Sequence, residues 1–298
     1  MLSYDVVDVF TDRPFAGNQL AVVHGAESLS TSQCLALAQE FGFSETTFPV
    51  PGADDAYATR IFTPAAEIPF AGHPTLGTAW MLRSRGLLSA AEVTQHCAAG
   101  QIGVRFLSGD EVELSAVPRD LVGPLDDALV ASLLEDVGLS FSDVAGPVWV
   151  AGTGLSFVHL PVVEEAVAAA RPPGRPLREH ADRIGAVGAA VDPVEGINLH
   201  AVTGEAPDLE VHARVFVPGL SVPEDPATGS AAAGLGMALV AAGRLPEGGR
   251  YAVTQGVEMG RPSRLLGRVE ATGGVPTRCH VAGQVQKVAS GEIAEPPV

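Results

Sequence analysis

The chain has 298 residues, of which 46% are hydrophobic, 18% charged and 5% aromatic, and this balance predicts a compact globular protein and argues against disorder. Its formal net charge of −17 repels phosphate backbones and anionic lipid headgroups, which argues against nucleic acid and membrane surfaces as partners. At roughly 100–200 residues per domain, the length predicts two domains.

Cysteine usage and the N-terminus indicate the compartment. The three cysteines are odd in number and lack CxxC spacing, which argues against a disulfide framework and a zinc site. The N-terminal MLSYDVVDVF has an acidic residue at position 5 and no basic stretch before an apolar run, so it does not resemble a signal peptide. The most apolar stretch, 231–242, is shorter than the roughly 20 residues that span a bilayer. We therefore expect a cytoplasmic protein.

The first half alternates strands with two helices. A helix is predicted from Ser30 to Phe41, because it begins with Ser/Thr, has apolar residues at helical spacing and is followed by Gly42. After a loop at 64–74, a second helix is predicted from Thr75 to Arg85. Residues 4–10 alternate and are rich in Val and Phe, which predicts a strand, and further strands are predicted at 20–24, 43–50, 56–62, 92–96, 103–106 and 111–115.

The second half repeats this general plan after a linker at 118–124. Its helices are predicted at 125–137, 163–170, 177–188 and 227–242, the last being rich in Ala and Gly. Its strands are predicted at 148–160, 197–203, 209–217 and from 251 onward, with a loop at 219–226.

A polar residue followed by proline opens a helix in each half, at His73-Pro74 and at Asp225-Pro226. This similarity indicates two related α/β halves that face each other across a cleft. Asp225 can be an ordinary N-cap, since Asp before Pro at a helix start is a common structural choice. The small residues that follow Pro226 also leave helix N–H groups accessible, and Gly72 lets a ligand approach the backbone. Such helix starts can hold a substrate carboxylate.

Two further side chains are candidates for chemistry. His73 is either structural or in contact with substrate. It lies between Gly72 and Pro74, which is an unusual context for a histidine packed in a core. Glu45 lies between Phe43 and Phe48; it either faces solvent from a strand or lies against an apolar wall that raises its pKa and suits it to acid–base catalysis. Residue patterns alone favour the solvent-facing position. HExxH, GxSxG, GxGxxG and GxxxxGK[ST] motifs are absent, and the eight histidines lack metal-ligand spacing.

Five segments, in order from about residue 4 to residue 291, resemble the motifs of PhzF-like phenazine biosynthesis proteins. They are Phe10-Thr11 with Pro14 to Asn18 and Ala21 to Val23; Phe43 to Phe48; Arg60 to Pro64 with Glu67 to Ala79; Arg214 to Phe216 with Glu224 to Ala231; and Gln255-Gly256 with Met259 to Ser263. Five motifs in the same order are far more specific than any one of them.

The resemblance implies an α+β fold of the diaminopimelate-epimerase-like type, with two pseudo-symmetric domains that each wrap a β-sheet around a central helix. We expect the N-terminal domain at 1–118, joined by a C-terminal strand at 284–298, and the C-terminal domain at 119–283. The central helices should start near His73 and Asp225, with the site between the domains. The family also implies a homodimer and no metal or organic cofactor.

The resemblance further implies a cofactor-independent isomerase. Glu45 would be the general acid/base that shifts a proton, with double-bond migration, on a small carboxylate-bearing, amino-acid-like substrate. His73 and Asp225 would be the other catalytic residues and would orient the substrate. The substrate-binding residues would be Asn18, Gly72, Gly229 and Ser230.

Two alternatives stay open. Racemases and epimerases of this superfamily use a cysteine at each helix start; here those places hold Gly72-His73 and Asp225-Pro226, which disfavours a two-thiol amino-acid racemase. A non-catalytic ligand-binding protein on the same scaffold is the other alternative, because fold and motif do not establish turnover. Neither the substrate nor the pathway follows from the sequence.

Overall fold

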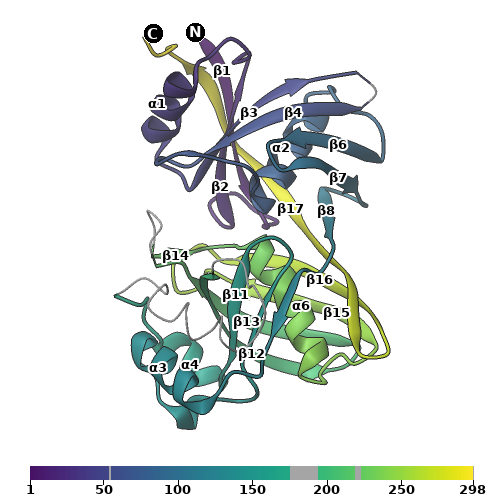
Figure 1. The fold of residues 1–298 in the computed structure, drawn as a ribbon. Helices are drawn as coiled ribbons and strands as arrows, with labels where there is room; N and C mark the ends of the chain where they lie inside the picture. Colours follow the sequence, from purple (N-terminus) through teal and green to yellow (C-terminus); the bar gives the residue numbers. More distant parts are fainter. Residues whose placement is uncertain (54, 175–193, 219–222, 298) are drawn as a thin grey trace. The chain divides into compact units, whose positions relative to one another are not determined.

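The computed structural model describes residues 1–53, 55–174, 194–218 and 223–297 (Figure 1). The chain forms two compact units, Met1–Leu114 with Ala282–Val298 and Ser115–Val281. The predicted domain division, with boundaries at 118/119 and 283/284, stays a prediction. The helix predicted at 177–188 lies outside the described residues.

The first unit is a sheet of mixed direction around one helix. β1 pairs antiparallel with β2 and β17, β2 pairs parallel with β3, β3 pairs antiparallel with β4, and β4 pairs parallel with β6. Its elements are β1 (Leu2–Val9), β2 (Asn18–His24), α1 (Thr31–Phe41), β3 (Glu45–Pro51), β4 (Ala56–Phe62), β5 (Glu67–Ile68), α2 (Gly72–Ser84), β6 (Glu92–Cys97), β7 (Gly100–Phe106), most of β8 (Glu111–Ala116) and the end of β17 (Val275–Ile293).

Helix α2 is the central helix of this unit. It contacts β1, β2, β3, β6 and β7, and its first turns are buried on nearly every side, as expected of a helix enclosed by a sheet. Gly77 permits this close approach, because a Cβ there would lie 2.7 Å from the side chain of Leu20 and 2.8 Å from that of Val9. Helix α1 packs instead through Cys34, Leu37 and Ala38 in a separate apolar cluster.

The second unit has a similar layout around α6 (Gly229–Ala241), which contacts β10, β11, β15 and β16. Helices α3 and α4 pack on one apolar cluster with β10, β11 and β12. Its remaining elements are β9 (Asp120–Val122), α3 (Asp127–Val137), a 3-10 helix (Phe141–Asp143), β10 (Trp149–Gly152), β11 (Ser156–Pro161), α4 (Glu164–Ala169), β12 (Val194–Glu205), β13 (Asp208–Phe216), β14 (Glu224–Asp225), β15 (Gly248–Gln255), β16 (Ser263–Thr272) and the start of β17.

The two units share an internal repeat, and each contains an equivalent Arg–Glu ion pair through which the repeat can be aligned. In the first, Arg60 forms a two-bond pair with Glu67 and lies over the ring of Phe62. In the second, Arg214 pairs in the same way with Glu224 and lies over Phe216. The strand registers agree, since Phe62 is opposite Glu67 and Phe216 is opposite Glu224.

Several predicted elements differ from the structure. The single strand predicted at 148–160 is two antiparallel strands, β10 and β11, joined by a tight turn; a Cβ on Gly152 would collide with the Leu155 carbonyl oxygen. The predicted linker contains β9, which pairs with β10. Helix α2 begins at Gly72, inside the predicted loop, and α6 begins at Gly229 rather than at 227. The short strand β9 and the division between β10 and β11 were missed because strands of a few residues leave no signal in residue periodicity.

None of the helices within the described ranges has the length and apolarity that a membrane crossing requires. The cytoplasmic location stays a prediction.

Candidate active site

Three predicted site residues come together in the first unit. Strands β2 and β3 run parallel with Leu20 opposite Glu45, so Asn18 and Glu45, each the first residue of its strand, lie at the same edge of the sheet. Helix α2 begins at this edge, and His73 is its second residue. The parallel pairing therefore explains why residues 55 positions apart in the chain, Asn18 and His73, are in contact.

His73 is held by hydrogen bonds at both ring nitrogens. Its Nδ1 lies 3.4 Å from Nδ2 of Asn18, and its Nε2 lies 3.3 Å from the backbone oxygen of Gln19. The geometry fits a ring that accepts from Asn18 at Nδ1 and carries its proton on Nε2. The same Nε2 faces Oε2 of Glu45 at 3.6 Å, beyond hydrogen-bond distance. His73 is thus fixed beside the Glu45 carboxyl group.

The Glu45 carboxyl group is largely buried rather than in solvent. Only 16% of its side chain is exposed, and Oε2 is buried without a hydrogen-bond partner in the described part of the chain. Burial raises the pKa of Glu45 to about 7, and a hydrogen bond with Ser44 opposes this rise. At neutral pH the group therefore populates both protonation states, which suits it to accept and return a proton.

The start of α2 offers backbone donors next to Glu45. Its N-cap residue, Ala71, has an apolar side chain and makes no capping hydrogen bond, so the first helix N–H groups lack the side-chain partner that usually satisfies them. Gly72 adds no side chain that would cover them. Together with the positive end of the helix dipole, these groups can hold an anion such as a carboxylate.

The second unit holds Asp225, Gly229 and Ser230, and the alternative that Asp225 is an ordinary helix N-cap is wrong, whereas its catalytic role stays a prediction. Asp225 lies in β14, and the N-cap of α6 is Thr228, whose hydroxyl donates to Oδ2 of Asp225. The physical reason is a turn that continues for three residues after Asp225 before the helix begins. Gly229 and Ser230 do form the first helical residues. Their use together with Glu45 stays a prediction.

Two residues outside the predicted site hold this turn in place. Gln255 donates from Nε2 to the Asp225 backbone oxygen at 2.7 Å and accepts from the Thr228 N–H at 3.3 Å. Ser263 donates to the Pro226 oxygen at 2.8 Å. Both belong to the fifth sequence motif, which therefore has a structural role before α6. Ser44, which also donates to Oδ1 of Asn18 at 3.3 Å, was missed as well, although it adjoins Glu45.

Comparison with known proteins decides the family. The model of the phenazine biosynthesis-like protein family (PhzC-PhzF) matches residues 7–291. This chain belongs to that family. A trans-2,3-dihydro-3-hydroxyanthranilate isomerase of Pseudomonas chlororaphis is 32% identical over 300 residues, covering 98% of this chain and 99% of the relative. The chain is accordingly an isomerase of the PhzF-like family.

Solved structures support the fold of this PhzF-like chain. A PhzF-family phenazine biosynthesis protein of Bacillus anthracis superposes with a TM-score of 0.82 at 23% identity, covering 98% of this chain and 99% of that one. A hydroxyproline epimerase of Agrobacterium vitis superposes with a TM-score of 0.62 at 16% identity, over 99% of this chain and 93% of that one. The predicted α+β, diaminopimelate-epimerase-like fold is confirmed.

The cysteines of this PhzF-like chain lie away from both helix starts. Cys34 and Cys279 are buried, and burial raises the pKa of Cys279 to about 12, so its thiol stays protonated at neutral pH. Cys97 is partly exposed at the end of β6. A thiol-based racemase therefore finds no support among the described residues.

We expect the Glu45→Gln variant to be more stable relative to the parent protein at high pH than at low pH. The pKa of Glu45 is about 7 in the folded protein against an ordinary value of 4.5, so the folded state holds the proton more tightly. The stabilising contribution of this protonation is full below pH 4.5 and is lost as pH rises through 7, a change of about 3 kcal/mol. Urea unfolding of both proteins at pH 5 and pH 8.5 measures it. The exposed-site variant Glu40→Gln is the control, and a Glu45→Gln effect equal at the two pH values would contradict the prediction.

Proposed function

We propose that this protein catalyses a proton shift, with migration of a double bond, on a small carboxylate-bearing, amino-acid-like substrate, with Glu45 as the general acid and base. The buried Glu45 carboxyl group carries the proposal, because its pKa of about 7 and its unpartnered Oε2 equip it for reversible proton transfer. In the reaction, the Glu45 carboxylate takes a proton from a carbon next to a double bond, and the electron pair of that C–H bond forms a new double bond to the adjacent carbon. The π pair of the old double bond moves to its far carbon, which takes a proton from the Glu45 carboxylic acid, so atoms and charges balance.

The internal repeat supports a mechanism with one carboxylate. Thr46 is opposite Phe62 in the first unit and Ile197 is opposite Phe216 in the second, so the position equivalent to Glu45 is Gly196. A Cβ on Gly196 would collide with the backbone oxygen of Phe216, so no side chain fits there. The second unit therefore has no carboxyl group at the position equivalent to Glu45.

Substrate orientation is proposed for the remaining residues. The backbone N–H groups at Gly72, and in the second unit those at Gly229 and Ser230, are candidates for holding the substrate carboxylate. His73 and Asp225 are candidates for contacts with its amino or hydroxyl group. Asn18, predicted to bind substrate, contacts His73 and Ser44, so we propose that it also orients the His73 ring.

The first substrate to test is trans-2,3-dihydro-3-hydroxyanthranilate, since the Pseudomonas chlororaphis relative is named as its isomerase. We expect NMR to show the double bond migrating and, in D₂O, deuterium at the newly formed C–H position, because a Glu45 carboxyl group that reaches solvent can exchange the abstracted proton before it is returned. Product formed without any deuterium would contradict exchange at Glu45. An unchanged substrate would redirect the search to other unsaturated cyclic amino acids. The predicted homodimer stays a proposal, testable by light scattering.

A further inference from the structure

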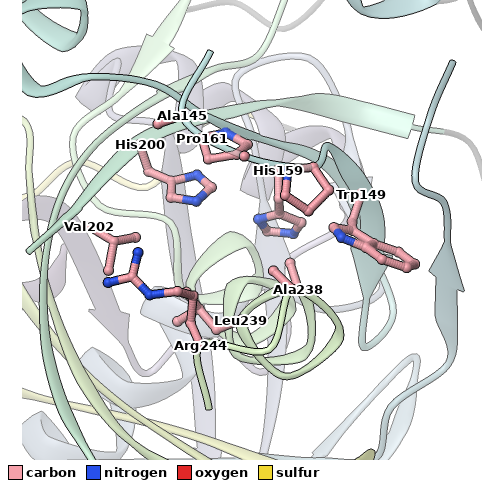
Figure 2. A pocket seen from close by; sticks show the side chains of 12 residues that line it. Ala145, Trp149, His159, Pro161, His200, Val202, Ala238, Leu239 and Arg244 are labelled. Carbon is pink, nitrogen blue, oxygen red and sulfur yellow. The ribbon is translucent and has the colours of Figure 1, made fainter. Parts of the chain in front are cut away.

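A cavity lies entirely within the second unit, between α6 and strands β10, β11 and β12 (Figure 2). Its volume is about 160 Å³. An engineered protein cavity of roughly 150 Å³ holds benzene, so this one accommodates a molecule of about one six-membered ring. None of its lining residues belongs to the predicted active site.

The charge of this cavity differs from that of the chain. The protein has 35 acidic residues and a net charge of −17, yet the lining contains no Asp or Glu. Its one charged member is Arg244, an exposed residue just after α6. The Arg244 guanidinium makes no ion pair or side-chain hydrogen bond with the residues that the structure describes. A cation without a counter-ion beside a cavity favours an anionic ligand.

His200 supplies a hydrogen-bond acceptor. The ring is 3% exposed, and its Nδ1 donates to the Asn198 backbone oxygen at 3.1 Å, which places the proton on Nδ1 and leaves a lone pair on Nε2. Within the described residues Nε2 has no partner. Burial, with a smaller effect from the Arg244 charge, lowers the pKa of His200 to about 4, so the ring is neutral at pH 7.

The neighbouring His159 shows by contrast what a purely structural histidine does here. Its Nδ1 accepts from Asn198 Nδ2 at 3.2 Å and its Nε2 donates to the Ala151 oxygen at 3.3 Å, so both ring nitrogens are satisfied. His159 therefore forms part of the wall, whereas Nε2 of His200 is available to a ligand.

Trp149 supplies a donor and a flat apolar surface. Its Nε1–H is buried and has no acceptor among the described residues. Figure 2 shows the nitrogen on the edge of the indole that is turned toward His159, with the six-membered ring on the far side. A buried N–H without an acceptor is unfavourable, so a ligand oxygen at this edge would satisfy it.

We propose that this cavity is a binding site for a ring-sized hydroxy acid, distinct from the Glu45 site. The ligand carboxylate pairs with Arg244, its hydroxyl group donates to Nε2 of His200, and an oxygen accepts from the Trp149 indole. The apolar side chains of Leu239 and Ala238 on α6 contact the ring.

The test uses 3-hydroxybenzoate as the probe, with 3-hydroxybenzyl alcohol as the uncharged comparison. The chain has two tryptophans, so the Trp80→Phe variant leaves Trp149 as the single indole N–H signal in ¹H–¹⁵N NMR. We expect 3-hydroxybenzoate to shift this signal in a saturable manner and the alcohol to bind at least about fivefold more weakly, because it cannot pair with Arg244.

Three further variants in the Trp80→Phe background locate the site. Arg244→Gln is expected to weaken the binding of 3-hydroxybenzoate by about fivefold or more. Ala238→Leu is expected to abolish binding, because the larger side chain fills the cavity. Arg278→Gln, at an exposed arginine outside the lining, is the matched control and should bind like the parent. An unshifted Trp149 signal, or equal affinity in the Arg244→Gln and Arg278→Gln variants, would overturn the proposal. If 3-hydroxybenzoate bound only at the Glu45 site, the Arg244→Gln and Arg278→Gln variants would have equal affinity. This test is therefore independent of the proposed function.

Discussion

Glu45→Gln is expected to lower kcat by about 10²- to 10⁴-fold while the fold is retained, the range that general acid–base catalysis contributes. Gln has nearly the same shape as the protonated Glu side chain but cannot exchange a proton. Because Oε2 is buried and makes no hydrogen bond in the described residues, the replacement breaks no hydrogen bond at this atom. Steady-state kinetics and circular dichroism on the same preparation measure the two expectations.

Two further variants test whether the loss of kcat depends on the position of the carboxyl group. Glu40→Gln changes an exposed glutamate on α1 in the same chemical way and should leave kcat unchanged. Glu45→Asp keeps a carboxyl group but withdraws it by one methylene, and we expect kcat between the parent and Glu45→Gln, since proton transfer depends on reach. Near-parental turnover by Glu45→Gln would show that another group moves the proton.

The sequence predicted those parts of the fold that depend on local chemistry. Helix α1 has the predicted limits because Ser30 caps its first turn, with Gln33 completing the capping box, and Gly42 takes the left-handed conformation that ends it. The α+β fold, by contrast, was predicted by motif resemblance, since residue periodicity alone indicated only two halves with a similar general plan.

Features that depend on distant pairing were not predicted. For Glu45, residue patterns alone favoured a solvent-facing strand position and only the motif resemblance indicated catalysis, whereas the parallel pairing of β2 and β3 places it at an edge next to the start of α2. Asp225 followed by Pro226 had the pattern of a helix cap, but the hydrogen bonds of Gln255 and Ser263 hold these residues in a turn before α6. In both cases tertiary contacts determine the environment of the side chain, and residue patterns carry no information about them.

The repeated Arg–Glu pairs give the other prediction with a large effect. We expect Glu224→Gln to destabilise the protein by about 3–5 kcal/mol, because it leaves the Arg214 charge buried without its counter-ion. Arg214 and Glu224 are each 7% exposed, and Arg214 also donates to the backbone oxygens of Val167 and Ala170 at the end of α4. The guanidinium group therefore cannot turn toward water when its partner is lost.

Glu67→Gln is the matched control within the same chain. The side chains of Arg60 and Glu67 have the same two-bond geometry but are 36% and 33% exposed, so water screens the pair and its loss should cost no more than about 1 kcal/mol. Urea unfolding midpoints of the two variants measure the contrast. Equal destabilisation would contradict the prediction, because the two pairs share the same two-bond geometry while the pair in the second unit is far more buried.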